Sequence, residues 1–546
     1  MSRDLKEIHP YLPKLAEQYT ERKVSRREFL RTATLLGLSA TAAYSIAGLP
    51  GGSYVRPAAA QTGGTVRISI RVPALDNPHT YSWVYDSNSA RQVLDYLTRT
   101  GFDNITRPWL CEWEASEDLK TWTLKLRKGV KWSNGEDFVA DHVIWNIKRW
   151  LDPNVGSSVL GLMKGYMMND EGTEIWDANA VEKVDDHTVR LNARVPQLAV
   201  PEHLFHYPAL ILHPEDNGVF GLGAKGTGAF KMVEYEVGKK AVFERREGYW
   251  GKPPALDRLE FIDLGDDPAA AINALASGQV MGMYEASTTQ YGALQKIEHV
   301  QIHTVDTAQT GVARMNPAYK PFDDPRVRKA MRLALDTEKL VQIAHLGLGQ
   351  PGEHHHVARV HPEYADVGFM KQDIEQAKKL LAEAGYPNGF DVEINTKKDP
   401  DWELISVQAM VQMWEQIGAR VKINVLPSAQ YWDIWNAPTN PFAFTAWTHR
   451  PLGVMVLGLA YRTGVPWNES HWSNPEFDAK LTEAEGILDP KERSKVMADL
   501  EKIMLEDGPA CIPLWRAVFT AMDKRIKGFQ AHPTSYFFCE EWSLEA

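Results

Sequence analysis

Apolar and polar residues alternate in several short stretches of the first half of the chain, which is typical of strands that bury one face. Residues 65–72 are apolar at every second position, and residues 122–127 follow the same pattern. Residues 181–193 and 230–244 each place a polar turn between two such runs. The pattern therefore predicts strands at 65–72 and 122–127 and a hairpin in each of the other two ranges.

The second half of the chain changes to a helical period. Asp324 and Asp373 each precede a stretch with apolar residues on one helical face, so we expect both carboxylates to cap helices. Beyond the second of these helices, the pattern predicts a strand at 390–394, a helix at 404–417 and a strand at 420–426. This alternation of strand and helix predicts a covered, partly parallel sheet.

The first sixty residues have the three parts of an export signal. The twin arginines Arg26 and Arg27 precede an uncharged run at 32–55, and small residues then lead to a cleavage site before Gln61. The alternative is an amphipathic helix that contains two arginines. A membrane anchor is disfavoured because glycines interrupt a run that would need ~20 apolar residues. We expect residues 1–60 to be a twin-arginine signal peptide with an N-terminal extension.

Composition and charge narrow the class of protein. The 546 residues are 44% hydrophobic and 24% charged, as in water-soluble proteins of more than one domain. The net charge of −11 argues against a nucleic-acid partner, since phosphate binding needs a basic face. Of the three cysteines, Cys511 and Cys539 are the pair to suspect of a disulfide in an oxidising compartment, and two buried free thiols are the alternative.

One block of residues carries a resemblance to a known family. Residues 113–118 lead into residues 122–132, which begin with the alternating run and are followed by Asn134-Gly135 and by Asp141-His142-Val143. This block resembles the signature of the family 5 extracellular solute-binding proteins, which are dipeptide, oligopeptide and nickel receptors of ABC importers. Further blocks resemble the family in the same order, at 226–230, 249–253, 275–278, 321–328, 380–387 and 474–478.

The resemblance implies an α/β fold, the large two-lobed periplasmic-binding-protein fold of class II type with an extra inserted subdomain in the first lobe. On this basis, residues 62–97, 222–307 and 511–546 would form lobe I. Residues 98–221 would form the inserted subdomain, and residues 308–510 would form lobe II.

The resemblance also implies the function of a periplasmic receptor, which captures a small solute by lobe closure and delivers it to an inner-membrane ABC permease. The solute is peptide-like or of another class. We expect a monomer without cofactor or metal, exported by the twin-arginine translocase. The alternatives are a periplasmic hydrolase or a peptide chaperone on the same fold. The sequence contains no Gly-x-Ser-x-Gly and no His-Glu-x-x-His motif, so we expect no enzyme activity.

Three aromatic residues near the start are candidates for ligand binding. Tyr81, Trp83 and Tyr85 follow the opening strand, and aromatic rings provide apolar area with a polar tip. The resemblance places a pocket-lining ring in this region. The alternative is that these rings anchor their own loop on the first lobe.

A second candidate stretch contains Trp447, His449 and Arg450. In peptide-binding relatives, an aspartate three residues after the equivalent tryptophan pairs with the ligand's α-amino group. Arg450 occupies that place here, and a guanidinium favours a carboxylate, phosphate or sulfonate over an ammonium. The alternative is that Arg450 pairs with a neighbouring acid.

The remaining candidates are histidines and C-terminal rings. Residues 354–356 are three consecutive histidines, which cannot easily direct all three rings at one metal ion. We therefore expect a ligand contact from His356 and no metal site. Trp515 and Tyr536 are further candidates, because relatives contribute rings from their C-terminal strands.

Overall fold

The computed structural model describes residues 5–47, 63–265, 267–398 and 400–545. The chain forms two compact units. Unit 1 comprises residues 1–285, 297–303 and 520–546, and unit 2 comprises residues 286–296 and 304–519. The sequence analysis placed the boundaries between lobe I and lobe II at 307/308 and 510/511.

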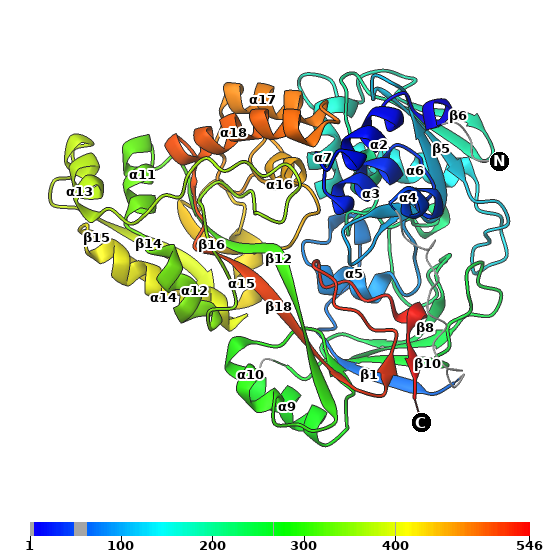
Figure 1. The fold of residues 1–546 in the computed structure, drawn as a ribbon. Coiled ribbons are helices and arrows are strands. Elements are labelled where there is room, and N and C mark those ends of the chain that lie inside the picture. The colour runs from blue at the N-terminus through cyan, green and yellow to red at the C-terminus, as the bar shows by residue number, and fades with distance from the viewer. Residues whose placement is uncertain (1–4, 48–62, 266, 399, 546) are drawn as a thin grey trace. The chain divides into compact units, whose positions relative to one another are not determined.

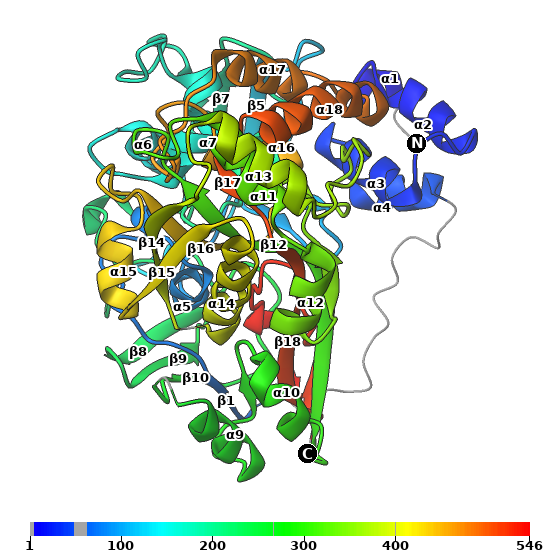
Figure 2. The ribbon, with the colours of Figure 1, turned by 90° about the vertical axis from the view of Figure 1, so that its left-hand side faces the viewer.

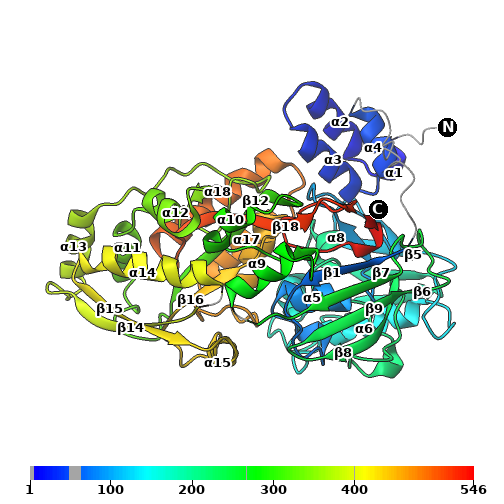
Figure 3. The same cartoon turned by 90° about the horizontal axis from the view of Figure 1, so that it is seen from below.

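The main sheet of unit 1 is built around the opening strand. β1 (Thr65–Ser69) buries Val66 and Ile68 and leaves the alternate side chains half-buried, so the two faces differ as the sequence pattern predicts. It lies parallel to β10 (Arg258–Ile262) and to β11 (Gly282–Met283). The predicted hairpin of β8 (Phe230–Glu236) and β9 (Lys240–Arg245) extends this sheet beyond β10. Figure 3 shows β8 and β9 side by side.

A second, antiparallel sheet in unit 1 corresponds to part of the region expected as an inserted subdomain. Its order is β4 (Cys111–Ala115), β5 (Thr121–Leu126), β7 (Thr188–Asn192) and β6 (Val181–Asp185). Helix α6 (Ala140–Leu151) packs against β6 and β7 and buries Val143, Ile147 and Trp150. The predicted strand at 122–127 and the hairpin at 181–193 are therefore confirmed.

Unit 2 contains the predicted helix-rich part of the chain. Asp324 caps α11 (Pro325–Leu333) and Asp373 caps α13 (Ile374–Glu383), and each carboxylate accepts a hydrogen bond from a backbone N–H of the first turn. The predicted strand–helix–strand unit is β14 (Phe390–Lys397), α14 (Asp401–Glu415) and β15 (Ala419–Leu426). Its two strands are parallel, as expected.

β16 (Phe442–Trp447) pairs with β14 and with β12 (Val300–Met315), which begins in unit 1 and continues in unit 2. β18 (Leu514–Asp523) runs beside β12 and also belongs to both units (Figure 1). The short strands β13 (Gly349–Pro351) and β17 (Ala510–Cys511) pair with β18 and β12. Helices α16 (Gly453–Ala460), α17 (Pro475–Glu485) and α18 (Pro490–Glu506) pack together in unit 2 (Figure 2).

Further helices and short strands complete the two units. In unit 1 they are β2 (Thr98–Thr100), β3 (Thr106–Pro108), β19 (Ile526–Lys527), β20 (Ser543–Leu544), α5 (Val84–Ala90), α7 (Ser158–Met167), α8 (Val200–His203) and α9 (Pro268–Ala276). In unit 2 they are α10 (Thr288–Leu294), α12 (Thr337–His345) and α15 (Ser428–Ile434). Of the short strands, β2 with β3 and β19 with β20 form separate two-stranded sheets.

The N-terminal segment is helical and belongs to unit 1. It contains α1 (Leu5–Ile8), α2 (Leu12–Thr20), α3 (Arg26–Leu35) and α4 (Ala40–Ile46). Arg26 and Arg27 lie on the exposed first turn of α3, whereas the rest of that helix is buried. The expected cleavage site before Gln61 lies outside the described residues, so the signal peptide stays a prediction.

All three cysteines are buried and free. Cys511 belongs to unit 2 and Cys539 to unit 1, and burial raises the pKa of the Cys511 thiol to about 12. The structure thus corrects the suspicion of a disulfide and agrees with the alternative of buried thiols.

Candidate functional site

Three side chains of unit 2 that the sequence analysis proposed for ligand binding lie together, with the rings of Trp447 and Trp515 beside that of His356. The His356 ring lies edge-on to Trp447 at 5.5 Å between ring centroids and is 6.0 Å from Trp515. Tyr461, which the sequence analysis missed, completes the group at 5.6 Å from His356. We call His356, Trp447, Tyr461 and Trp515 the unit 2 ring cluster.

Each ring of this cluster is fixed by the element that carries it. Trp447 is the last residue of β16 and pairs with Thr310 of β12, while Trp515 is near the start of β18 and pairs with Gln350 of β13. Tyr461 caps the C-terminal end of α16. His356 lies in the loop after β13 with φ of 52°, a conformation that non-glycine residues adopt rarely and that is found disproportionately at functional sites.

A buried carboxylate orients the indole of Trp447. Glu469 accepts a hydrogen bond from Trp447 Nε1 at 2.6 Å through one oxygen. Its other oxygen accepts from Arg314 Nε and from Thr445 Oγ1, each at 2.7 Å. Glu469 thus fixes the ring and neutralises a buried guanidinium at the same time. No sequence pattern pointed to it, because it lies in a loop 22 residues beyond Trp447.

Two polar atoms of the ring cluster are buried without an internal partner. His356 Nδ1 shares a hydrogen bond of 2.8 Å with the Tyr461 hydroxyl. Within the part of the chain that the structure describes, neither His356 Nε2 nor Trp515 Nε1 has a hydrogen-bond partner. Burial, reinforced by the nearby Arg450, holds the pKa of His356 well below 6.5, so the imidazole is neutral at physiological pH. The cluster therefore offers a neutral imidazole nitrogen and an indole N–H.

His449 and Arg450 lie beside the ring cluster, and both are engaged with the backbone of unit 2. His449 Nδ1 accepts a hydrogen bond from the Ala308 N–H at 2.9 Å. Arg450 is 3% exposed, and its Nη1 donates to the carbonyls of Thr448 and His449 at 3.2 and 3.0 Å. These contacts fix the guanidinium locally, and its charge is close enough to lower the pKa of His356.

The three consecutive histidines turn to three different neighbours. His354 Nδ1 accepts from the Ile512 N–H at 3.0 Å, and His356 bonds Tyr461. His355 Nε2 is 3.9 Å from a carboxylate oxygen of Glu501. Because the rings diverge, they do not form a shared set of metal ligands.

In unit 1, Trp83 and Tyr85 lie together and are half-buried. Their ring centroids are 5.9 Å apart, and Tyr85 contacts Tyr284 edge-on at 6.3 Å. Tyr284 was not a candidate from the sequence. Tyr81, in contrast, is buried and donates its hydroxyl to the Leu75 carbonyl at 3.2 Å, as expected of a ring that anchors its own loop.

Tyr536 belongs to a different group of unit 1 side chains. The guanidinium of Arg91 lies 3.8 Å from the Tyr536 ring centroid, and Phe205 contacts the same ring edge-on at 5.2 Å. Asn88 of α5 holds the backbone around it, bonding the Ser535 carbonyl and the Phe537 N–H at 2.9 Å each. Tyr536 is thus tied to an internal cation–π contact.

One group of side chains has the composition of a metal site. Glu136, His142 and His213 bring one ligand atom each within 4.8 Å of one another. However, Nδ1 of His142 accepts from Trp132 Nε1 and Nδ1 of His213 accepts from the Glu215 N–H, at 3.1 and 3.2 Å. Since both donors are N–H groups, each Nδ1 must present a lone pair, which leaves the ring hydrogen on Nε2, where it faces Glu136. The arrangement favours a hydrogen-bonded carboxylate over a bound metal.

The comparisons with known proteins agree with this two-unit α/β architecture. Residues 106–463 match the family described as bacterial extracellular solute-binding proteins, family 5. The sequence is 26% identical over 488 residues to the periplasmic oligopeptide-binding protein OppA of Haemophilus influenzae, covering 84% of this chain and 89% of that protein. It is 25% identical over 460 residues to the glutathione-binding protein GsiB of Pectobacterium atrosepticum, covering 79% and 84%.

Solved structures show the same fold. The binding protein AgaA of A. tumefaciens in complex with agropinic acid superposes with a TM-score of 0.79 at 22% identity, covering 89% of this chain and 99% of that one. DppA of Helicobacter pylori in complex with the peptide STSA gives a TM-score of 0.77 at 20% identity, with the same coverage. The protein thus has the fold of the periplasmic binding proteins. It belongs to the family 5 bacterial extracellular solute-binding proteins, and its role is that of a solute-binding receptor.

In the described residues, no helix has both the length and the apolar character needed to cross a bilayer.

Proposed function

We propose that this protein is the periplasmic receptor of an ABC importer and that the unit 2 ring cluster holds the ligand. The family match supports the receptor role, and the observation that carries the choice of site is the pair of buried polar atoms on His356 and Trp515. Buried polar groups are normally hydrogen-bonded, so a bound solute that satisfies both would gain affinity without breaking an internal contact.

The chemistry of the cluster favours a compact solute with a carboxylate beside a flat or apolar body. The Trp515 N–H can only donate, so the ligand must present an acceptor to it. Arg450 places a positive charge near His356. The rings of Trp447 and Tyr461 supply apolar area. A short peptide, a peptide-like acid or an opine would satisfy these requirements, and capture would proceed by lobe closure and transfer to an inner-membrane permease.

Mass spectrometry of the protein purified under native conditions tests this proposal. We expect one small acidic compound in stoichiometric amount, recovered chemically intact, because a receptor has no catalytic groups to alter it. Adding that compound to the ligand-free protein should raise Tm in proportion to the logarithm of its concentration. Recovery of a cleaved compound would favour the hydrolase alternative instead.

The charge of Arg450 provides a sharper test of the ligand class. Arg450→Gln keeps a hydrogen-bonding side chain but removes the positive charge, so calorimetry should show at least about tenfold weaker binding of a carboxylate ligand. Unchanged affinity would remove the anionic preference from the proposal while leaving the receptor role intact.

We further propose that the twin-arginine translocase exports the protein, that residues 1–60 are then removed, and that the mature receptor acts as a monomer. The motif at Arg26 and Arg27 and the periplasmic relative support this location. Replacing both arginines by lysine should retain the precursor inside the cell, as fractionation would show. The native mass of the exported protein in solution should be that of one chain, as expected of a monomer.

A further inference from the structure

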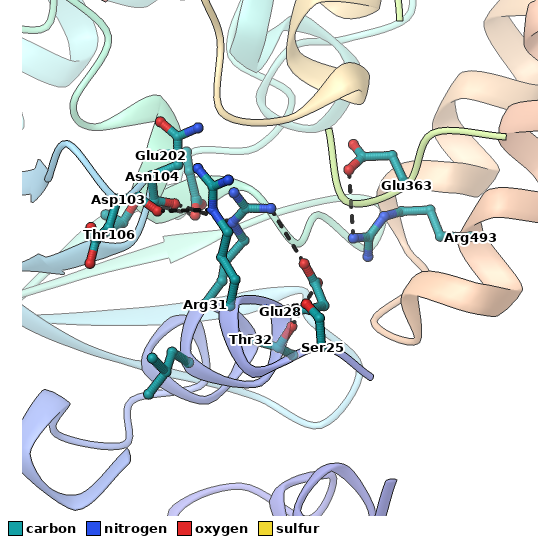
Figure 4. Close-up of polar contacts among 12 residues, drawn as sticks. Ser25, Glu28, Arg31, Thr32, Asp103, Asn104, Thr106, Glu202, Glu363 and Arg493 are labelled. Carbon is teal, nitrogen blue, oxygen red and sulfur yellow. Dashed lines mark hydrogen bonds and ion pairs between the residues drawn. The ribbon is translucent and has the colours of Figure 1, made fainter. Parts of the chain in front are cut away.

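The helix that carries the twin arginines packs against the folded body of unit 1. Arg27 Nε donates to the Asp103 carbonyl and Arg31 Nε donates to the Asn104 carbonyl, both at 3.2 Å. Figure 4 shows Arg31 reaching from α3 toward Asp103 and Asn104. Two arginines of the motif region are thus hydrogen-bonded to one loop of the receptor.

Several polar groups of α3 are satisfied in this docked position, although Arg31 Nη2 is buried without a hydrogen-bond partner among the described residues. Ser25 caps the helix by accepting from the Glu28 N–H, and Glu28 accepts from Thr32 Oγ1 at 3.1 Å. Glu28 also pairs with Arg31 at 3.4 Å, and less than a tenth of either side chain is exposed. A buried ion pair of this kind is costly unless its remaining hydrogen bonds are made, and Asn104 supplies one of them.

The apolar face of α3 is covered as well. Phe29, Leu30 and Leu35 are each at most 5% exposed. Trp113 of β4 donates its indole N–H to the Leu35 carbonyl at 2.7 Å, which satisfies a carbonyl at the end of the helix. Gly37 follows with φ of 87°, and a Cβ there would lie 3.1 Å from the Trp113 carbonyl oxygen. The chain beyond the helix therefore approaches β4 closely.

From these contacts we propose that the folded receptor binds its own leader helix and thereby competes with the export receptor for it. The inference rests on the proposed export route. The binding surface on unit 1 is formed by Asp103, Asn104 and Trp113, and its occupant is α3 of the same chain. A protein that reads the side chains from Ser25 to Arg31 can reach Phe29, Leu30 and Arg31 only after α3 has left this surface.

The fraction of molecules in which α3 is released determines how strongly the export receptor binds. When only a fraction of molecules has α3 released, the apparent affinity of the export receptor is its intrinsic affinity multiplied by that fraction. Since the surface exists only after unit 1 has folded, folding itself would regulate access to the signal. Once residues 1–60 are removed, the indole of Trp113 loses its partner at Leu35.

The first test is hydrogen exchange on the full-length precursor. We expect the amides of residues 29–35 to exchange slowly in the wild-type chain. Trp113→Phe keeps a ring in place but removes the N–H donor to Leu35, so exchange of these amides should accelerate about tenfold. Thr20→Ala is the matched control, because the Thr20 hydroxyl makes an exposed local bond to the Ala16 carbonyl. Exchange of residues 29–35 at the rate of an unfolded chain in the wild type would overturn the docking.

The second test is the rate of export in cells. Trp113→Phe leaves the leader sequence unchanged, so faster appearance of the processed protein would support competition, and an unchanged rate together with faster exchange would overturn it. N-terminal sequencing of the exported protein separates the two possible failures. A start at Met1 would reject the leader assignment on which the proposal rests, whereas a start near Gln61 with an unchanged rate would reject only the competition.

Discussion

Trp447 of unit 2 and the pair Trp83 and Tyr85 of unit 1 lie in different surroundings. In unit 2 the ring of Trp447 is bonded to a buried carboxylate that also pairs with a buried guanidinium. In unit 1 Trp83 and Tyr85 are half-buried, and their rings contact each other and Tyr284. Trp447 is thus held by a directional hydrogen bond, whereas the ring contacts of Trp83 and Tyr85 add apolar area with little directionality.

From this difference we infer a division of labour in ligand recognition. Groups fixed by hydrogen bonds discriminate between ligands strongly, because a ligand that fails to match leaves buried polar atoms unsatisfied. Apolar rings gain affinity from buried area and tolerate variation in the ligand. We therefore expect unit 2 to set specificity and unit 1 to add general affinity.

The largest expected effect concerns the anchor of Trp447. Glu469→Ala leaves the guanidinium of Arg314, which is 1% exposed, without its carboxylate. Breaking a buried ion pair on one side costs about 3–5 kcal/mol, so the free energy of unfolding should fall by that amount. Urea denaturation followed by tryptophan fluorescence measures it.

The matched control is a carboxylate in an exposed pair of the same unit. Glu393 contacts Lys422 at 2.7 Å, and both side chains are exposed, so Glu393→Ala should cost less than about 1 kcal/mol. If both variants lost the same free energy of unfolding, Glu469 would not be a special anchor of Trp447. The proposed difference between the two units would then be wrong.

The next effect is on pH dependence and concerns Glu501 beside the histidine loop. Burial raises its pKa from 4.5 to about 9, and burial lowers the pKa of His355 from 6.5 to about 3. Between pH 6.5 and 9 the folded state holds a proton on Glu501 that the unfolded state has lost, whereas His355 is neutral in both states. Stability should therefore decrease as pH rises through this window, by at most about 1.4 kcal/mol per pH unit.

Urea midpoints at pH 7 and pH 9 measure this slope. Glu501→Gln keeps the shape and cannot ionise, so its slope should be much smaller than that of the wild type. Glu492→Gln changes an exposed carboxylate of the same helix and should leave the slope unaltered. A wild-type protein whose midpoint is constant over this range would contradict the assignment of a buried neutral Glu501.

A smaller effect separates ligand binding from folding in the unit 2 ring cluster. Trp515→Phe removes a buried N–H that has no partner in the described protein, so the free energy of unfolding should stay constant or rise by up to about 1 kcal/mol. Affinity for the ligand should fall about tenfold, because the donor to its acceptor group is gone. Calorimetry and urea denaturation on one preparation give both values.

Trp402→Phe is the control for that variant. Trp402 is a buried tryptophan of unit 2 whose Nε1 is likewise without a hydrogen-bond partner among the described residues, and it lies outside the ring cluster. It should show the same change in stability and no change in affinity. A loss of affinity only in Trp402→Phe would show that the ligand does not bind at the ring cluster.

The sequence predicted the fold well where local chemistry determines it. Alternation identified β1 and β5, and capping aspartates identified α11 and α13, because each signal is contained within a few consecutive residues. The fold class was predicted from the resemblance to the family, and the family match and the structural neighbours confirm it.

The site was predictable only in part, because its geometry depends on distant residues. The sequence named Trp447, His356 and Trp515, which carry recognisable aromatic or imidazole chemistry. Glu469 and Tyr461 were missed because each acts through one contact to a residue far away in the chain, and a single sequence does not record such pairs. The assignment of ligand contacts itself stays a prediction.

The smallest expected effect tests the role of unit 1. Trp83→Ala removes a half-buried ring, so we expect a modest loss of stability, about 1 kcal/mol or less. If apolar area is what unit 1 contributes, affinity should fall severalfold for every ligand tested and by similar factors for each. Trp515→Phe should instead penalise most the ligands that present the best acceptor. Competition binding with a small panel of acids and their amides distinguishes the two patterns. A Trp83→Ala variant that discriminates between acid and amide would assign specificity to unit 1 as well and remove the proposed division between the units.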